Sequence, residues 1–221
     1  MLSFDFKSAS RPTAEIVCDA LTLRPAEPRD ADAWLRLRAT SRAHLVRWEP
    51  AWKPSDATPE AFRARVRAHA RARRAGVALP LLMFRRDDDR LVGGVTLANI
   101  RYQAACSGQI GYWVGAPFVR RGYALAAVRA VMRHAFERLG LNRIEAASQP
   151  DNVASCRLLE RAGFVAEGYA RDYLYINGAW RDHRLFAAIA ADFGAARFRA
   201  RPPSTPGRAD VKRPKRAANA Q

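Results

Sequence analysis

The segment from Gly111 to Ala126, G-Y-W-V-G-A-P-F-V-R-R-G-Y-A-L-A, has the composition of a phosphate-binding turn. An apolar strand pattern runs into a turn that contains arginine and glycine, and a long amphipathic helix pattern starts at once. Free N–H groups and the positive dipole end at a helix start bind anions. Gly122 and Ala124 have small side chains, so the backbone can approach a pyrophosphate closely. On these residues alone, the segment predicts either a phosphate site or an ordinary strand-to-helix turn.

Other chemistry-bearing patterns are missing from the sequence. It contains neither a Walker A motif nor G-x-G-x-x-G after a strand, which disfavours the P-loop and Rossmann classes. The cysteines and histidines are widely scattered, so we expect no disulfide framework and no metal site. These residues are Cys18, Cys106 and Cys156, and His44, His69, His134 and His183.

The chain is strongly basic, with a net charge of +17 from 38 basic and 21 acidic residues. All but four of the basic residues are arginine, which is also what a GC-rich coding bias would produce. Such a surface attracts polyanions such as RNA and phosphorylated cofactors. Residues 195–221 hold eight basic residues, one acid and four prolines. This stretch predicts a disordered basic tail that could contact RNA non-specifically.

Length and composition indicate one folded domain. The 221 residues are 49% hydrophobic and 27% charged, which is ordinary for a globular chain with a real core. The longest uncharged apolar run, Leu91 to Ile100, is about half of what a membrane-spanning helix needs. The first ten residues lack the apolar core of a secretory signal. We therefore expect a cytoplasmic protein that does not enter the membrane.

The pattern of apolar residues predicts a mixed α/β domain without internal repeats. Strands are expected at residues 21–24, 79–84, 91–100, 109–114, 142–148, from 165 to about 176, and 184–190. Helices are expected after residue 30, at about 58–75, from about 125 to 139 and at 152–162. The single helix between Val114 and Ile144 permits one parallel strand pair there.

Thirty residues after the arginine–glycine turn comes D-N-V-A-S-C-R-L-L-E-R-A-G-F, Asp151 to Phe164. Together the two segments resemble the GNAT acetyltransferases, over roughly residues 21–190. The resemblance implies a GNAT-like domain with a mostly antiparallel sheet and a splayed parallel strand pair at the cofactor site. It also implies acetyl-CoA as cosubstrate, with the pyrophosphate on backbone amides of the Q/R-x-x-G-x-G/A loop. That loop corresponds here to Val119, Arg120, Arg121, Gly122, Tyr123 and Ala124.

Three further residues follow from this resemblance. Val119 departs from the family pattern, which has Gln or Arg at that position, so one polar contact is expected to weaken. Asn152 matches the asparagine that bonds the pantetheine arm. The oxyanion donor is expected to be a backbone N–H near Val114, where the family's strand bulges, and the following Gly115 is consistent with a bulge.

The stretch A-G-F-V-A-E-G-Y-A-R-D-Y-L-Y-I-N-G-A-W-R-D-H, which ends at His183, resembles the RimJ/RimL-type branch. The RimJ type acetylates the N-terminal alanine amine of small-subunit ribosomal protein five. This implies a ribosomal protein N-terminus as partner, while the oligomeric state stays open. The corresponding division of the chain is an N-terminal extension (1–20), the acetyltransferase domain (21–192) and a basic tail (193–221).

The catalytic residues are less well defined by the sequence. Many family members place a tyrosine seven residues after the asparagine, but here that position is Leu159. The RimJ/RimL-type resemblance instead points to Ser155, whose hydroxyl would protonate the leaving thiolate. The alternative is that Ser155 bonds its own helix backbone. Nothing in the sequence activates the neighbouring Cys156, which we interpret as a packing residue.

A general base is harder to identify. Glu145 and Asp172 are the better candidates and Glu167 the third, although each could be a solvated strand-edge carboxylate. Two alternative functions also stay open. One is acetylation of a small amine such as a polyamine or an aminoglycoside. The other is a non-catalytic ribosome- or RNA-binding protein that retains the fold.

Overall fold

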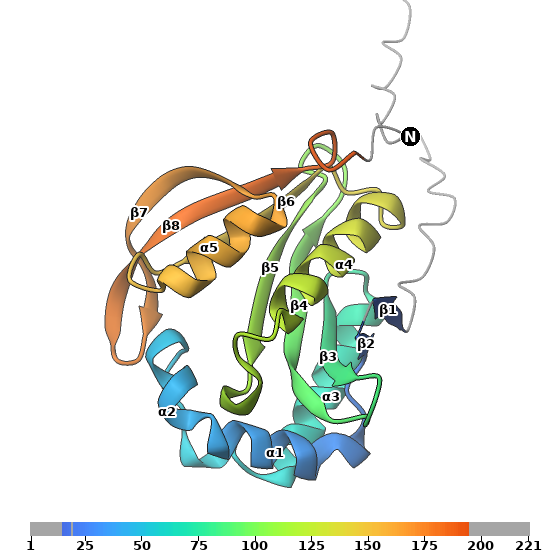
Figure 1. The fold of residues 1–221 in the computed structure, drawn as a ribbon, viewed down its shortest axis with the longest axis vertical. Helices are drawn as coiled ribbons and strands as arrows, with labels where there is room; N and C mark the ends of the chain where they lie inside the picture. Colours follow the sequence, from blue (N-terminus) through green and yellow to red (C-terminus); the bar gives the residue numbers. More distant parts are fainter. Residues whose placement is uncertain (1–14, 19, 195–221) are drawn as a thin grey trace, which may run out of the picture.

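One sheet of eight strands organises the molecule. The computed structural model describes residues 15–18 and 20–194. The strands lie in the order β1-β2-β3-β4-β5-β6-β8-β7 (Figure 1). Their bounds are β1 Ile16–Cys18, β2 Leu21–Arg24, β3 Leu79–Arg85, β4 Leu91–Arg101, β5 Ser107–Val114, β6 Arg143–Ser148, β7 Val165–Ile176 and β8 Ala179–Ile189. Every neighbouring pair is antiparallel except β5 and β6. This confirms the predicted single α/β domain with a mostly antiparallel sheet and one parallel pair.

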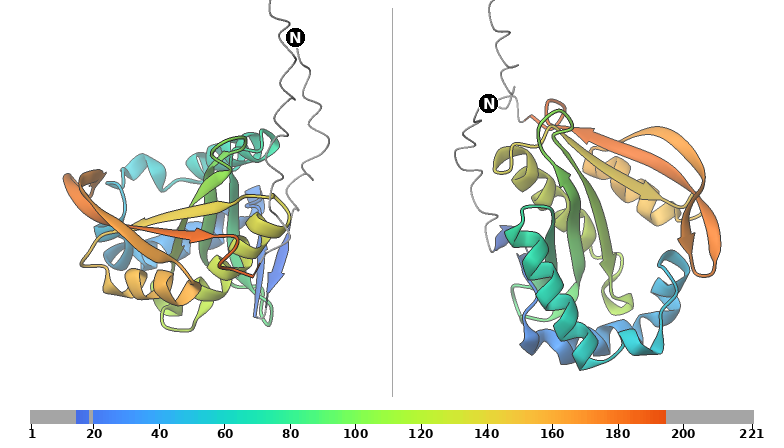
Figure 2. Two further views of the ribbon diagram at one scale, coloured as in Figure 1. Left: turned by 90° about the horizontal axis from the view of Figure 1, so that it is seen from above. Right: turned by 180° about the vertical axis from the view of Figure 1, so that it is seen from behind.

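Helices cover both faces of the sheet. They are α1 Ala31–Thr40, α2 Arg42–Leu45, α3 Pro59–Arg74, α4 Tyr123–Glu137 and α5 Val153–Ala162, with short 3-10 turns at residues 28–30, 46–48, 54–56 and 116–118. Helix α3 lies on one face, whereas α4 and α5 lie on the other (Figure 2). Across residues 15–18 and 20–194, no helix has the length and apolarity to span a bilayer.

The long elements agree with the sequence pattern within a few residues, and two short ones are additional. Strand β1 lies inside the stretch predicted as an N-terminal extension and pairs with β2 through three residue pairs. Helix α2 is a single turn, too short to give a periodic signal. At the other end, Phe193 packs against Phe136 with ring centroids 5.6 Å apart. The rest of the predicted basic tail, from residue 195, lies outside the described residues.

Helix α4 fixes the position of the site because its apolar stripe is fully buried. Val128, Val131, Met132, Ala135 and Phe136 are inaccessible to solvent. Burying a valine, methionine or phenylalanine side chain stabilises the folded chain by about 1.5–3 kcal/mol, and the alanine contributes less. The stripe anchors the helix on the sheet, so its N-terminus is held beside the end of β5.

The parallel pair holds over only three residue positions. Ser107, Gly108 and Gln109 of β5 pair with Arg143, Ile144 and Glu145 of β6. Beyond them, β5 stays paired with β4 up to Val114, and β6 stays paired with β8 up to Ser148. The two strands therefore diverge, as the ribbons in Figure 1 show, and we call the region between their diverging backbones the opening.

Gly93 of β4 has no side chain, which allows the backbone of β5 to pass close to it. A Cβ on Gly93 would overlap the Trp113 carbonyl oxygen of β5 and lie 2.5 Å from the Met83 Cε atom. Both neighbours belong to the packed sheet, and the carbonyl is backbone that cannot rotate away. Gly111 of β5 is the useful contrast, because a Cβ there would meet nothing within 4 Å.

We predict that Gly93→Ala lowers the free energy of unfolding by about 1–3 kcal/mol, the usual cost of overpacking. Gly111→Ala in the neighbouring strand should change it by less than about 0.5 kcal/mol. Urea denaturation of both variants measures the difference. Equal stabilities of the two variants would show that the sheet relaxes around the added methyl group.

Candidate active site

The turn before α4 presents unpaired backbone N–H groups. Arg120 and Gly122 both have left-handed backbone conformations, with φ of 61° and 79°. Gly122 is the N-cap of α4 and no side chain caps the helix there. The first helical bond runs from the Ala126 N–H to the Gly122 carbonyl at 3.0 Å. The N–H groups of residues 123–125 therefore lie outside the helical ladder, as an anion site requires.

The diverging part of β5 also carries unpaired backbone groups. The Gly115 N–H donates to the Val92 carbonyl of β4 at 2.9 Å. Because N–H groups alternate between the two edges of a strand, those of Tyr112 and Val114 point the other way, toward the opening where β6 has diverged. The Val114 N–H is thus positioned to bind an oxygen atom of a ligand in the opening.

The bulge expected beside Val114 is not present in β5. Strand β5 pairs in register with β4 through Val114, and its irregularity lies at the other end, between Ala98 and Arg101 of β4. Gly115 has an ordinary φ of −62°. Its small size is required by Leu37 of α1, whose Cγ atom would lie 2.8 Å from a Cβ at this position. The prediction of a bulge was therefore wrong, although the N–H of Val114 is free for another reason.

A cavity of about 740 Å³ opens between the turn, β5, α5 and the α2 region. It gathers every residue predicted to bind the cofactor, together with Ser155. Its lining includes Val114, Val119, Arg120, Arg121, Gly122, Tyr123, Ala124, Asn152, Ser155, Tyr112, Trp113, Arg157, Leu158, Arg161, His44, Trp48 and Glu49. Four arginines face one carboxylate in this lining, so the cavity favours an anionic ligand.

Ser155 and Tyr112 join the two sides of the opening. The Ser155 hydroxyl lies 2.9 Å from the Tyr112 hydroxyl, and either oxygen can donate. The Ser155 N–H donates to the Asn152 side chain at 3.2 Å, which caps α5. The hydroxyl of Ser155 is therefore not used by its own helix, contrary to the alternative that the sequence left open. Tyr112 was not singled out by the sequence.

The Tyr112 hydroxyl is kept protonated by its surroundings. Burial raises the pKa of Tyr112 to about 12, against a smaller lowering by the hydrogen bond with Ser155. Tyr112 therefore stays a neutral hydroxyl at any pH at which an amine is acetylated. The neighbouring Cys156 is buried, and its thiol contacts the Gln149 carbonyl at 3.7 Å. This agrees with its interpretation as a packing residue.

None of the three carboxylates considered as a base lines the cavity. Glu145 lies 2.9 Å from the Arg143 guanidinium, at the last pair of the parallel ladder. The same guanidinium binds Glu167 at 2.5 Å and holds the pKa of Glu167 below its usual value. Asp172 sits in the irregular part of the β7–β8 pair, exposed, with its N–H bonded to Asp182 at 2.8 Å. The structure therefore separates these carboxylates from Ser155.

The carboxylate that does line the cavity is Glu49, which the sequence did not single out for chemistry. Arg38 binds both of its oxygens, at 2.8 and 2.5 Å, and the Trp52 indole N–H donates to it at 2.8 Å. Its backbone carbonyl accepts a bond from the Asn177 N–H in the β7–β8 turn at 3.1 Å. Glu49 thus ties the loop after α2 to the hairpin. In the sequence, Glu49 stands between Trp48 and Pro50, and no other local feature draws attention to it.

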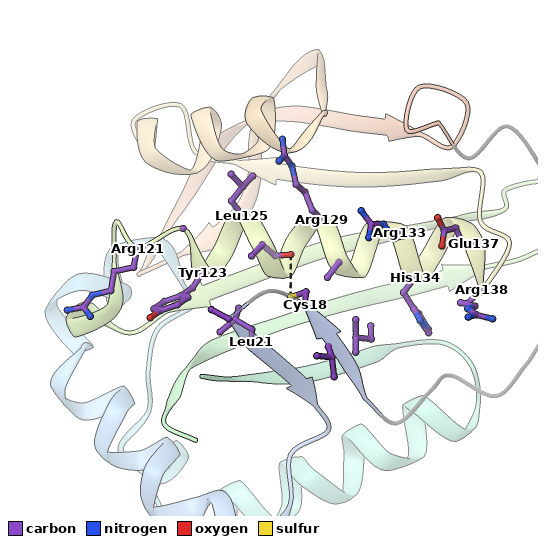
Figure 3. Close-up of a pocket in the computed structure, with 16 residues that line it drawn as sticks. Cys18, Leu21, Arg121, Tyr123, Leu125, Arg129, Arg133, His134, Glu137 and Arg138 are labelled. Atoms are coloured by element: carbon purple, nitrogen blue, oxygen red, sulfur yellow. Dashed lines mark hydrogen bonds between the residues drawn. The ribbon is translucent and has the colours of Figure 1, made fainter. Parts of the chain in front are cut away.

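A second groove of about 780 Å³ runs along the other side of α4, beside β1 (Figure 3). It shares Arg121, Gly122, Tyr123 and Leu125 with the cavity but contains neither Ser155 nor Asn152. Figure 3 shows Arg129 and Arg133 directed away from Cys18, and the Arg129 guanidinium bonds the Arg161 carbonyl of α5. The arginines of this groove do not converge on a common point, which makes the first cavity the better candidate for the active site.

The fold and the turn together define an acyl-CoA-binding class, and comparison with known proteins agrees. Residues 20–165 match the model of the family described as acetyltransferase (GNAT) domain. This chain belongs to the GNAT acetyltransferase family.

Several relatives match nearly their whole length. "Probable N-acetyltransferase YjcK" of Bacillus subtilis is 35% identical over 77% of this chain and 94% of its own. The [ribosomal protein uS5]-alanine N-acetyltransferase of Escherichia coli is 31% identical over 84% of this chain and 96% of its own. Among solved structures, Mycobacterium smegmatis RimJ in complex with CoA-disulfide is 32% identical, with a TM-score of 0.75 over 82% of this chain and 90% of the other.

We predict that Gly122→Val raises the KM for acetyl-CoA about tenfold. The φ of 79° disfavours a β-branched residue by about 1–2 kcal/mol, and a turn that relaxes from this conformation moves its N–H groups away from the phosphates. A loss of about 1.4 kcal/mol in binding corresponds to tenfold. The added side chain would also project from the turn where phosphate oxygens must approach. Steady-state kinetics with varied acetyl-CoA measures the change.

Gly140→Val is the matched control. Gly140 also has a positive φ, of 66°, with nothing within 4 Å of a Cβ, but it follows the far end of α4. The Gly140→Val substitution should lower the unfolding temperature about as much as Gly122→Val does, and it should leave the KM for acetyl-CoA unchanged. A Gly122→Val enzyme with the wild-type KM would place the phosphates elsewhere.

Proposed function

We propose that this protein transfers the acetyl group of acetyl-CoA to the α-amine of an N-terminal alanine in small-subunit ribosomal protein five, in the cytoplasm. The observation that carries the proposal is the pair of hydroxyls, Ser155 and Tyr112, inside the cavity onto which the phosphate-binding turn opens. The name of the E. coli relative supports this acceptor.

The residues at the donor end suit a phosphorylated thioester. Acetyl-CoA, when bound, supplies the activated carbonyl carbon. The free N–H groups at the start of α4 and the guanidiniums of Arg120 and Arg121 would hold its pyrophosphate. Asn152 and the N–H of Tyr112 face the opening and would bond the pantetheine arm. The N–H of Val114 would stabilise negative charge on the carbonyl oxygen in the transition state.

The hydroxyl pair supplies the proton that the departing thiolate needs. Ser155 would donate its proton to the departing sulfur and take up in exchange the proton that the acceptor nitrogen loses, so its hydroxyl is restored. Tyr112 would orient the serine hydroxyl through their 2.9 Å contact. Burial keeps Tyr112 protonated, so it remains a hydrogen-bond donor in this pair. Removing either hydroxyl should slow the chemical step without weakening the binding of the acetyl-CoA phosphates to the turn before α4.

The part of the cavity that receives the acceptor amine requires no strong base if that amine is an α-amine. Such an amine has a pKa of about 7.7–8.0, whereas a lysine has about 10.4. Glu145 and Asp172 stay predictions without a place in the cavity. Glu49 has one free acceptor position left beside Arg38 and Trp52, and we assign it the role of receiving the acceptor's ammonium group.

The composition of the cavity argues against a small polycation as acceptor. A polyamine or aminoglycoside would meet four arginines in the cavity lining and one carboxylate, Glu49, which already binds Arg38. A peptide N-terminus carries one positive charge and needs one such partner. The non-catalytic alternative is disfavoured because the turn, Ser155 and Tyr112 are assembled in one cavity.

We predict acetylation of free N-termini in preference to lysines. At pH 7.5 roughly a third of an α-amine is neutral, against about one part in a thousand of a lysine. Incubation with acetyl-CoA and total ribosomal proteins, followed by mass spectrometry, locates the acetyl groups. The rate on an alanine-terminated peptide should rise with pH and level off above about 8, when the amine is neutral. Modification mainly on internal lysines would overturn the proposed acceptor.

We predict that Ser155→Ala lowers kcat about 10²-fold, the lower range for loss of a general acid, with little change in the KM for acetyl-CoA. Tyr112→Phe should lower kcat less, and the double variant should be no slower than Ser155→Ala, because both act on one proton. Ser155→Thr keeps the hydroxyl and serves as the control. Full activity of Ser155→Ala would exclude this serine as the acid.

A further inference from the structure

Helix α3 carries a ridge of arginines that the acetyl-transfer chemistry does not use. Arg63, Arg67, Arg71 and Arg74 recur at steps of four, four and three residues, and all are exposed. At this spacing they fall within about 80° of the helix circumference and extend about 16 Å along it. None of them lines the cavity. We call these four residues the α3 ridge.

The ridge has a fixed orientation because the opposite side of α3 is packed into the core. Phe62 is 1% exposed and its ring lies 5.2 Å from that of Trp34. Figure 2 shows α3 lying along the face of the sheet opposite α4. A rigid helix therefore presents the ridge outward, on a side of the molecule that leaves the N-terminus of α4 uncovered.

Most of the ridge lacks carboxylate partners. Arg63 pairs with Glu60 at 3.1 Å. Within residues 15–18 and 20–194, no carboxylate lies within 4 Å of Arg67, Arg71 or Arg74. Elsewhere, arginines such as Arg24, Arg38 and Arg143 bind acids at 2.5–2.9 Å.

This arrangement costs the free protein stability. Like charges four residues apart on a helix destabilise it by about 0.2–0.5 kcal/mol per pair, and Arg63, Arg67 and Arg71 form two such pairs. Their common face is what a polyanion with repeated charges would neutralise. The ridge thus has the charge and the repeat of a surface for phosphate groups, which guanidiniums bind in a bidentate manner.

We propose that the α3 ridge docks the phosphate backbone of base-paired RNA. The other exposed positions of α3 are Glu60, Ala64, Arg65 and Ala68, none of which has an aromatic or large apolar side chain. A protein interface draws most of its energy from buried aromatic and apolar anchors, and a single-strand site needs aromatic rings for base stacking. Base-paired RNA is bound through its backbone and shape, for which the ridge suffices.

Docking at α3 is compatible with catalysis because the two surfaces do not overlap. The inference does not depend on the proposed acceptor, since it rests on the charge and packing of α3 alone. It does predict that the enzyme can hold a structured RNA while its cavity stays open to a peptide. An acceptor that belongs to a ribonucleoprotein would then be presented at raised local concentration.

The test compares two triple variants of the full-length chain with the same loss of charge. R67Q/R71Q/R74Q removes the unpaired arginines of the ridge and keeps good helix formers. R36Q/R133Q/R181Q removes three exposed arginines from α1, α4 and β8, which have no carboxylate partner within the described part of the chain. Binding to a fluorescein-labelled RNA duplex is measured by anisotropy at several salt concentrations.

We expect the ridge variant to bind less tightly and with a shallower salt dependence. Loss of three phosphate contacts lowers the slope of log K against log[salt] by about 2.7, so raising salt from about 50 to 200 mM should weaken wild type about 40-fold more than the ridge variant. The dispersed variant should stay close to wild type. Both variants should acetylate a short peptide at the wild-type rate, which separates this test from that of the proposed function.

Three outcomes would overturn the proposal. Equal loss of RNA binding in both triple variants would show that only net charge matters. A ridge variant that binds RNA normally but loses binding to phosphatidylserine-containing vesicles would make α3 a membrane-facing surface. Loss of binding to a poly-glutamate peptide alone would make it a site for acidic protein segments. An unfolding temperature equal to or above that of wild type shows that the ridge variant is folded.

Discussion

The site depends on one constraint of the sheet, which is that β5 and β6 pair over three positions and then part. Each strand keeps its other partner beyond that point, so the divergence leaves one edge of β5 without hydrogen bonds while the strand stays rigid. Unpaired backbone groups inside a protein are costly unless a ligand or water satisfies them. The opening is therefore a place where an extended molecule with amide groups can take the role of a missing strand. The packed stripe of α4 then fixes where the helix N-terminus, and with it the phosphate site, must lie.

Much of this arrangement could be predicted from the sequence. The α4 stripe has clear helical periodicity, and the R-R-G-Y-A turn contains the small residues that a backbone anion site needs. The contacts that cross between elements could not be predicted. Tyr112 meets Ser155 because α5 returns over the opening, and no local pattern marks that contact. Gly115 was attributed to a bulge, yet its size is set by Leu37 of α1, seventy-eight positions earlier in the chain. Glu49 reaches the cavity through a loop between single-turn elements, which have no periodic signal.

The carboxylates show how tertiary contacts decide between similar residues. Glu145 and Glu167 lie in strands near the opening, but both form ion pairs with the Arg143 guanidinium. These ion pairs make either carboxylate a poor candidate for proton transfer. Asp182 is held in the same way by the Tyr169 hydroxyl at 2.6 Å and by the Asp172 N–H, which together lower its pKa. The one carboxylate of the cavity lining, Glu49, also binds an arginine, Arg38. A site without an unpaired carboxylate suits the proposed α-amine acceptor, which deprotonates unaided.

The same excess of arginine gives the molecule two separate cationic surfaces with different designs. In the cavity, Arg120 and Arg121 adjoin backbone N–H groups that are fixed by a left-handed turn, so geometry adds selectivity to charge. On α3, the guanidiniums stand on a packed helix without such backbone donors, so charge and spacing act alone. The arrangement in the cavity suits a single buried phosphate group, because desolvated, directed donors bind one anion tightly. The arrangement on α3 suits a long polyanion, because each exposed contact is weak and salt-sensitive and many contacts add up along the polyanion. The proposed acceptor belongs to a ribonucleoprotein, and for such an acceptor the two surfaces would have complementary roles, one to hold the cosubstrate and the other to keep the enzyme near its target.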